Sequence, residues 1–105
     1  MNIKYDDQNI RGLFEAILLL ENMDECYRFF DDICTVPELK AISQRLAVAK
    51  MLRNKQVYSD IVGETGASTA TISRVNRSLN YGSDGYALVL DRVVPEEEQE
   101  DDEQL

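Results

Sequence analysis

The chain has 105 residues and a mass of 12.0 kDa, which suffices for one domain, because domains ordinarily contain about 100 to 200 residues. Its 44% hydrophobic and 30% charged residues are typical of a globular protein, and no stretch approaches the roughly 18 uncharged apolar residues of a membrane helix. The net charge is −9 and the chain has no histidine, which removes the commonest general base and metal ligand and, with them, most catalytic arrangements.

Three helices are predicted in the first half of the chain. The first covers residues 9–22, where apolar residues recur at the i, i+3, i+4 spacing of an amphipathic helix. The second covers residues 24–35, with Asp24 as its N-cap, and the third covers residues 37–53, with Pro37 suited to its first turn. The third helix is expected to carry an apolar stripe at Leu39, Ile42, Leu46, Ala49 and Leu52.

The first two predicted helices are apolar over more than one face, and a single small chain has little material with which to cover them. Homodimerisation through these helices is the economical solution, and a monomeric bundle is the alternative. No segment alternates with period two, so an all-α fold is expected. Cys26 and Cys34 have the spacing of neither a redox pair nor a disulfide framework, so both are expected to be buried, reduced thiols.

Residues 57–79 carry the signals of a helix-turn-helix, in which two short helices cross at a tight turn. Gly66 can adopt the positive φ that ends the first helix, and Ser68 is placed to cap a second helix that begins near Thr69. The apolar residues expected to pack in this unit are Ile61, Val62, Ala67, Ala70, Ile72, Val75 and Leu79.

The outer face of the second helix is predicted to be polar, basic and free of acids, as a recognition helix in the DNA major groove requires. An ordinary helical hairpin with a solvated face is the alternative. The candidates for DNA contact on this helix are Ser68, Thr69, Thr71, Ser73, Arg74 and Arg77, with Thr69 and Thr71 expected at base edges. The residues expected to bind backbone phosphates are Arg53, Lys55, Tyr58 and Ser59.

Charge is segregated along the chain. Residues 40–82 carry a net charge of +5, whereas residues 1–39 and 83–105 carry −6 and −8. A local positive patch decides phosphate contact more than the total charge does, because salt screens exposed charges beyond about 10 Å. Residues 95–105 contain seven acids and a single apolar residue after the proline, so we expect a disordered acidic tail that either aids solubility or competes with DNA for the basic segment.

Three short runs carry a family resemblance. The run Gly-Ala-Ser-Thr-Ala-Thr-Ile-Ser-Arg at 66–74, with Gln44-Arg45-Leu46 and Met51-Leu52-Arg53 upstream, resembles the tryptophan repressor family and, within it, the YerC/YecD group of TrpR-like proteins. The resemblance covers about residues 10–92. It implies an all-helical, intertwined homodimer with six helices per chain, of which the fourth and fifth bind DNA. It also implies a last helix near residues 84–93 that packs Tyr86, Leu88, Val89 and Leu90.

The resemblance also implies an effector pocket. In the tryptophan repressor, indole is held between two arginines, which match Arg45 and Arg74 of this chain. The glycine after the second arginine is replaced by Val75, whose branched side chain takes room that indole would need. We therefore expect a small-molecule effector other than tryptophan, or none.

These patterns together predict a homodimeric, sequence-specific transcriptional regulator, most simply a repressor, with its DNA-binding domain over residues 1–94 and a tail over 95–105. The N-terminus has no secretion signal, so we expect the protein in the cytoplasm. Two recognition helices about 34–36 Å apart would require double-stranded DNA with a near-palindromic operator. The alternative is a helical dimeric interaction module that does not bind DNA directly. No enzymatic activity, cofactor, metal or membrane association is expected.

Overall fold

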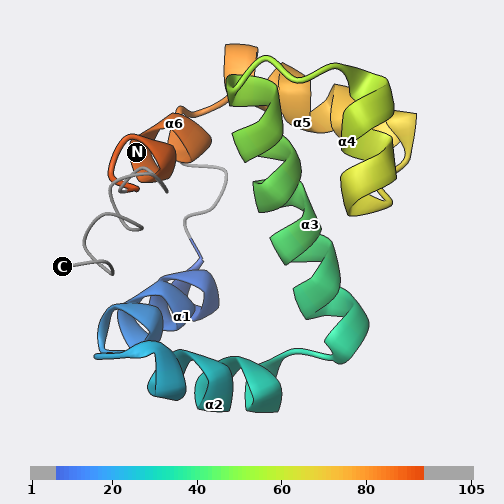
Figure 1. The fold of residues 1–105 in the computed structure, drawn as a ribbon. Helices are drawn as coiled ribbons and strands as arrows, with labels where there is room; N and C mark the ends of the chain where they lie inside the picture. Colours follow the sequence, from blue (N-terminus) through green and yellow to red (C-terminus); the bar gives the residue numbers. More distant parts are fainter. Residues whose placement is uncertain (1–6, 94–105) are drawn as a thin grey trace, which may run out of the picture. The chain divides into compact units, whose positions relative to one another are not determined.

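The computed structural model describes residues 7–93, which form six α-helices and no β-strand (Figure 1). This confirms the predicted all-α, six-helix fold. The contacts divide the chain into two compact units, with the boundary between Leu39 and Lys40. The acidic tail predicted for residues 95–105 lies outside the described residues. The helices are α1 (Gln8–Leu18), α2 (Met23–Ile33), α3 (Val36–Arg53), α4 (Tyr58–Thr65), α5 (Thr69–Tyr81) and α6 (Gly85–Leu90).

Side-chain caps define where α1 and α2 begin. The Asp7 carboxylate accepts the backbone N–H of Asn9 at 2.6 Å and starts α1. The prediction of Asp24 as the second N-cap is wrong. The side-chain oxygen of Asn22 accepts the N–H of Glu25 at 2.9 Å, so α2 begins at Met23 and Asp24 lies in its first turn. A carboxylate is stabilising there, because it faces the positive end of the helix dipole.

α1 is shorter than the predicted 9–22. It ends at Leu18, where the next two backbone N–H groups bond to carbonyls three residues back, as helices commonly do in a tightened last turn. The early end leaves Asn22 outside α1 and free to cap α2. The two helices of the first unit are therefore separated by a short connection, and each is only 11 residues long.

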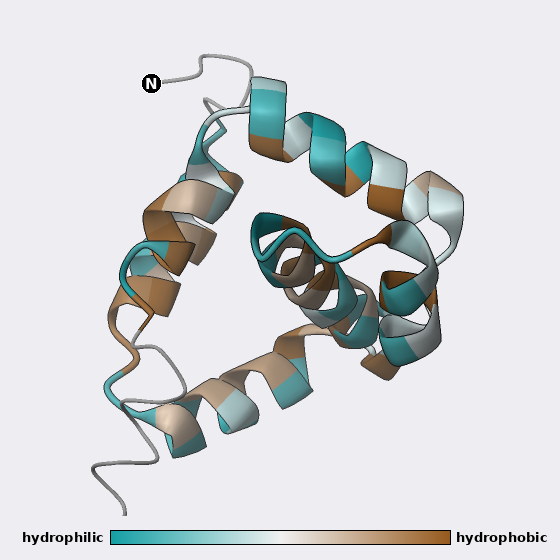
Figure 2. Cartoon of the chain, turned by 45° about the horizontal axis from the view of Figure 1, so that its top comes forward, coloured by the Kyte–Doolittle hydropathy of each residue, from teal (hydrophilic) through white to brown (hydrophobic). Residues whose placement is uncertain are grey.

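Within residues 7–93, several large apolar side chains of α1 and α2 are exposed. Neither helix has a buried residue, and Leu18, Met23 and Tyr27 are 83%, 70% and 70% exposed. Cys26 and Cys34 are free thiols, as predicted, but they are half-buried, which corrects the expectation of full burial. Hydrophobic and hydrophilic residues lie on different sides of the helices (Figure 2), so the uncovered sides are available to another surface.

α3 begins with a capping box, in which two residues exchange side-chain to backbone hydrogen bonds. Thr35 Oγ1 accepts the N–H of Glu38 at 3.2 Å, and Glu38 Oε1 accepts the N–H of Thr35 at 2.9 Å. The bond from the backbone N–H of Thr35, helped by its side chain, lowers the pKa of the Glu38 carboxyl below its usual range. Pro37 lies in the first turn of α3, as predicted.

The hydrophobic core lies in the second unit, and α3, α4 and α5 contribute to it. The predicted stripe of α3 is only partly correct. Ala49 is buried, whereas Ile42 and Leu46 are 53% and 43% exposed, and the fully buried Val48 was not part of the stripe. Both α4 and α5 pack over the Val48 side of α3, and only that packing decides which side is the core. The buried residues are Val48, Ala49, Ile61, Ala67, Ile72 and Val75.

α6 is shorter than the helix expected near residues 84–93. Two of the four residues expected to pack do so, because Tyr86 and Leu90 contact the core. The other two, Leu88 and Val89, are 54% and 49% exposed. A six-residue helix makes fewer than two turns, so only one side of it can reach α3 and α5.

Candidate nucleic-acid interface

α4 and α5 form a helix-turn-helix where the sequence predicts one, at residues 57–79, with a three-residue turn between them (Figure 1). Gly66 ends α4 with a φ of 73°, and its N–H bonds to the carbonyl oxygen of Val62 at 2.9 Å. This left-handed conformation is the one expected of a glycine after a helix. Ala67, the next residue, is buried, so the turn packs against the core.

This turn is stabilised by the side chains of Thr65 and Gln44, neither of which the sequence analysis predicts. Thr65 Oγ1 donates to the carbonyl oxygen of Ile61 at 2.7 Å and accepts the N–H of Ala67 at 3.1 Å. Gln44 on α3 donates through Nε2 to the carbonyl oxygen of Thr65 at 3.0 Å. A threonine directly before a turn glycine is a local signal for the first pair of bonds. No local signal could have linked Gln44 to the turn, because the two are 21 residues apart.

Ser68 caps α5, as predicted. Its Oγ accepts the backbone N–H of Thr71 at 3.1 Å and lies 3.1 Å from Thr71 Oγ1, to which it donates. Thr71 is half-buried, whereas Thr69 is exposed. Of the two residues predicted to contact base edges, Thr69 is therefore the more accessible, and the hydroxyl of Thr71 already has a partner within the protein.

The burial of Ile72 and Val75 fixes how α5 is rotated about its axis. Residues at i and i+4 lie on the same side of a helix, so the side opposite the core is a continuous strip. Ala70 lies on this strip and is exposed, which corrects the expectation that it packs. The part of this strip from Thr69 to Arg77 is called the reading face below, and its exposed residues are Thr69, Ala70, Ser73, Arg74 and Arg77.

The reading face combines short hydroxyls with two positive charges. α5 contains two arginines and no acidic residue. Its N-terminus adds the partial positive charge of unsatisfied backbone N–H groups. Such a surface attracts a polyanion by charge and can place small hydrogen-bonding groups against it.

The predicted phosphate contacts lie at the junction of α3 and α4. Lys55, Tyr58 and Ser59 are all exposed there. Arg53 is placed differently, because its guanidinium forms an ion pair with the carboxylate of Asp91 at the end of α6. A phosphate at Arg53 would have to replace this internal partner, whereas the other three side chains have no such competitor among the described hydrogen bonds.

Lys55 has a backbone conformation that usually requires glycine. Its φ is 63°. Its N–H bonds to the carbonyl oxygen of Leu52 at 2.9 Å, and the N–H of Gln56 bonds to that of Met51 at 3.1 Å, which is the Schellman arrangement at a helix end. A residue with a side chain pays about 1–2 kcal/mol in this conformation. The lysine side chain therefore stands where glycine would be more stable, directly before α4.

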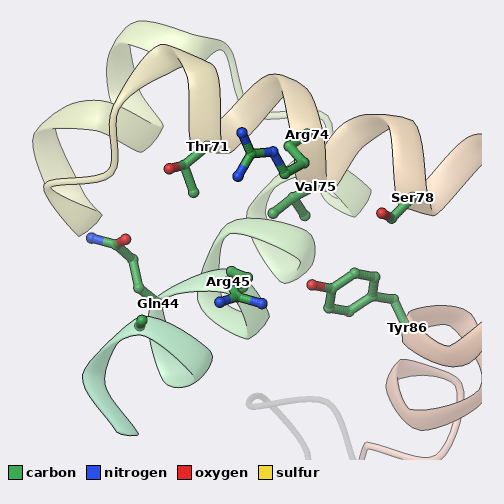
Figure 3. Close-up of a pocket in the computed structure, with 8 residues that line it drawn as sticks. Gln44, Arg45, Thr71, Arg74, Val75, Ser78 and Tyr86 are labelled. Carbon is green, nitrogen blue, oxygen red and sulfur yellow. The ribbon is translucent and has the colours of Figure 1, made fainter. Parts of the chain in front are cut away.

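The structure brings Arg45 and Arg74 to one cavity of about 240 Å³ in the second unit (Figure 3). Tyr86 projects into this cavity from α6 (Figure 3), and sequence reasoning had not assigned it a place there. Val75 forms part of the wall, as expected if it limits the room for an aromatic ligand. The cavity has two guanidinium groups and no acid, which suits a small anionic or polar molecule. The full lining is Ala41, Gln44, Arg45, Thr71, Arg74, Val75, Ser78 and Tyr86.

Within residues 7–93, no three cysteine or acidic side chains gather closely enough to hold a metal ion. The helices described there all lack the combination of length and apolarity that crossing a membrane demands.

Comparisons with known proteins extend over nearly the whole chain. Residues 8–94 match the family model described as Trp repressor protein. The chain is 56% identical over 90 residues to the uncharacterized protein YerC of Bacillus subtilis (strain 168), and the alignment covers 86% of each protein. These matches confirm the resemblance inferred from residues 66–74 and the runs upstream of them.

Two crystal structures have the same fold as this chain. One, from Staphylococcus aureus and named for the Trp repressor, is 55% identical with a TM-score of 0.82, covering 88% of this chain and 93% of that one. The other, a TrpR-like protein from Eubacterium eligens ATCC 27750, is 58% identical with a TM-score of 0.83, covering 87% of this chain and 94% of that one. The similarity in sequence and in fold therefore spans both compact units.

Proposed function

The chain belongs to the Trp repressor family, a regulatory DNA-binding family, and on this premise we propose that it is a sequence-specific transcriptional repressor that reads double-stranded DNA with α5. The observation that carries this proposal is the acid-free, exposed reading face, held on the core by the Gly66 turn and the Ser68 cap. A recognition helix needs this combination of an open polar surface and a fixed orientation.

Base contacts and phosphate contacts are assigned to different parts of this surface. Thr69, at the N-terminal end of the reading face, is proposed to meet a base edge, and Thr71 would do so only after its hydroxyl leaves Ser68. The positioning contacts fix the protein on the duplex without reading its sequence. They are assigned to Arg53, Lys55, Tyr58, Ser59, Ser68, Ser73, Arg74 and Arg77.

The working form is proposed to be a homodimer in the cytoplasm. The exposed apolar faces of α1 and α2 support dimerisation, because a second copy is the simplest cover for residues such as Leu18 and Met23. Residues 1–94 would then form one domain in the dimer, although a single chain divides at Leu39. Two reading faces related by a two-fold axis require a near-palindromic operator with half-sites about 34–36 Å apart.

An effector is proposed only in general terms. The cavity between Arg45 and Arg74 could hold a small anionic or polar molecule, and the presence of Val75 in its wall disfavours tryptophan. Because Arg74 belongs to the reading face and also lines the cavity, a ligand in the cavity would act on DNA binding through the position of α5.

Selection of duplexes from a random pool at physiological salt tests the proposal. We expect one enriched site with two-fold symmetry, and an affinity that falls steeply with salt because bound phosphates release counterions. Sedimentation of the free protein should give the mass of two chains. A pool with no enriched sequence and a salt-independent affinity would overturn the proposal and favour the interaction module that does not bind DNA.

A further inference from the structure

We propose that the acidic C-terminal segment, residues 95–105, docks on exposed basic side chains of the second unit, including Arg74 and Arg77 of the reading face, and competes with DNA for them. The regulation inferred here rests on the proposed function, because it acts on the same surface. We use the name basic surface for five exposed side chains of the second unit. Two belong to the reading face and three lie in the last turn of α3 or just after it: Arg74, Arg77, Lys50, Arg53 and Lys55.

Charge complementarity is the first argument. The acidic segment contains seven carboxylates and no basic residue. Among residues 7–93, only Arg53 of the five basic side chains forms an ion pair with an acid. The other four therefore present charge that a polyanion can use, and the chain carries its own polyanion a short distance along the sequence.

The contact of Arg53 with α6 is the second, independent argument. The Arg53 guanidinium pairs with the carboxylate of Asp91, and its Nη1 also donates to the carbonyl oxygen of Ala87 at 3.4 Å. Asp91 lies four residues before Pro95, where the acidic segment begins. A carboxylate four residues before the segment thus already pairs with Arg53, so the described chain ends close to one side chain of the basic surface.

The acidic segment is long enough to reach the basic residues of α5. Twelve residues follow Val93, and an extended chain covers at most about 3.3–3.6 Å per residue, or roughly 40 Å in all. α5 has 13 residues, which corresponds to a length of about 20 Å. From the end of α6, the acidic segment can therefore reach every basic residue of α5 in its own chain.

Tethering makes such a weak contact effective. A segment held near its target has an effective concentration that reaches the millimolar range for short linkers. If it occupies the basic surface nine-tenths of the time, the apparent affinity for DNA falls about tenfold. Salt weakens the internal contact, because exposed charges are screened. The inhibition should therefore be strongest at low ionic strength.

The docking itself can be tested without DNA. The full-length chain is compared with a full-length variant whose acidic segment is neutral: Glu96→Gln, Glu97→Gln, Glu98→Gln, Glu100→Gln, Asp101→Asn, Asp102→Asn and Glu103→Gln. We expect the side-chain Nε–Hε NMR signals of Arg53, Arg74 and Arg77 to shift between the two proteins at low salt and to converge at 0.5 M salt. Arg11 and Arg28, which pair with Glu15 and Asp24 in the first unit, are internal controls that should not move. Unchanged signals from all three arginines of the basic surface would overturn the proposal.

A matched pair of variants separates competition from a mere change in net charge. Glu97→Gln with Glu98→Gln and Asp31→Asn with Asp32→Asn each remove two negative charges, the second pair from the exposed surface of α2. At low salt, Glu97→Gln with Glu98→Gln should strengthen binding to the selected duplex about twofold or more, and the fully neutral segment should strengthen it about tenfold. Asp31→Asn with Asp32→Asn should change this affinity little. Equal effects of the two pairs would overturn the competition. Failure to bind any duplex would instead overturn the proposed function, whereas the arginine signals would still decide the docking.

Discussion

The side-chain amide of Gln44 donates a hydrogen bond to the backbone carbonyl oxygen of Thr65 at 3.0 Å. This bond joins the long helix α3 to the last residue of α4, directly before the Gly66 turn. The last four carbonyls of a helix have no partner within the helix, so Gln44 satisfies a group that the turn itself leaves open. The orientation of the reading face therefore depends on a residue of α3.

Replacing Gln44 with alanine is expected to loosen the turn. The half-buried carbonyl of Thr65 loses its donor, which costs about 1 kcal/mol of unfolding free energy, and DNA affinity should fall as α5 loses its fixed orientation. Chemical denaturation and duplex titration measure the two effects. Ser43→Ala on the same helix is the control, since among the described residues the Ser43 hydroxyl bonds only to the carbonyl oxygen of Lys40. Equal effects at both positions would contradict the assigned role of Gln44.

Two glycines of one hairpin should respond to alanine in opposite ways. Gly66 has a φ of 73°, whereas Gly63 lies within α4, and a Cβ at either position meets no atom within 4 Å. Gly66→Ala should destabilise the protein by about 1–2 kcal/mol through backbone strain alone. Gly63→Ala should stabilise it by about 0.5–1 kcal/mol, because alanine favours the helix. Thermal unfolding of both variants checks the signs, and a stabilised Gly66→Ala would refute the role of the turn.

Lys55→Gly is expected to separate stability from DNA binding. It relieves a positive φ of 63° and should raise the unfolding free energy by about 1 kcal/mol, while removing a phosphate contact and weakening DNA binding. Asp84 has a φ of 62° at the start of α6 and supplies the matched control. Asp84→Gly should give a similar gain in stability and leave DNA affinity unchanged. If Lys55→Gly binds DNA as tightly as the parent, Lys55 does not contact phosphate.

Arg77→Ala and Thr69→Ala should differ in the kind of binding that they lose. Arg77 contacts phosphate in the proposed complex, so its loss should weaken all duplexes alike and reduce the slope of log affinity against log salt by about 1. The Thr69→Ala variant should lose the ability to discriminate between bases at one base pair in each half-site. Repeating the duplex selection with each variant makes the comparison, and identical profiles would reject the division between positioning and reading.

The Glu38 capping box predicts a specific pH dependence of stability. The pKa of Glu38 is lowered in the folded protein by the hydrogen bonds from Thr35. The contribution of the Glu38 carboxylate to stability is therefore present above the pKa that Glu38 has in the unfolded chain. It is lost as pH falls through the lower pKa that Glu38 has in the folded protein. Chemical denaturation of the parent and of Glu38→Gln should give a difference in unfolding free energy at pH 7, called the gap here, and this gap should narrow toward pH 3. In a Thr35→Ala background the gap should be smaller but not zero, because the backbone N–H of Thr35 remains. A gap that widens on acidification would contradict the capping role.

The sequence by itself determined the features that a few neighbouring residues encode. The turn at Gly66 depends on one backbone conformation, and the cap at Ser68 depends on one hydrogen bond between residues three apart in the sequence. Both were therefore predictable, as was membership of a family recognised by the run around them. Local signals failed where two residues could serve the same purpose, as when Asn22 rather than Asp24 capped α2.

Only the tertiary structure decided which distant groups meet. Gln44 and Thr65 are 21 residues apart, and Arg53 pairs with Asp91 across 38. The side of α3 that became core was set by where α4 and α5 pack, which is why Val48 is buried and Leu46 is not. Burial and long-range hydrogen bonds depend on how whole helices pack, and the periodicity of one helix does not contain that information.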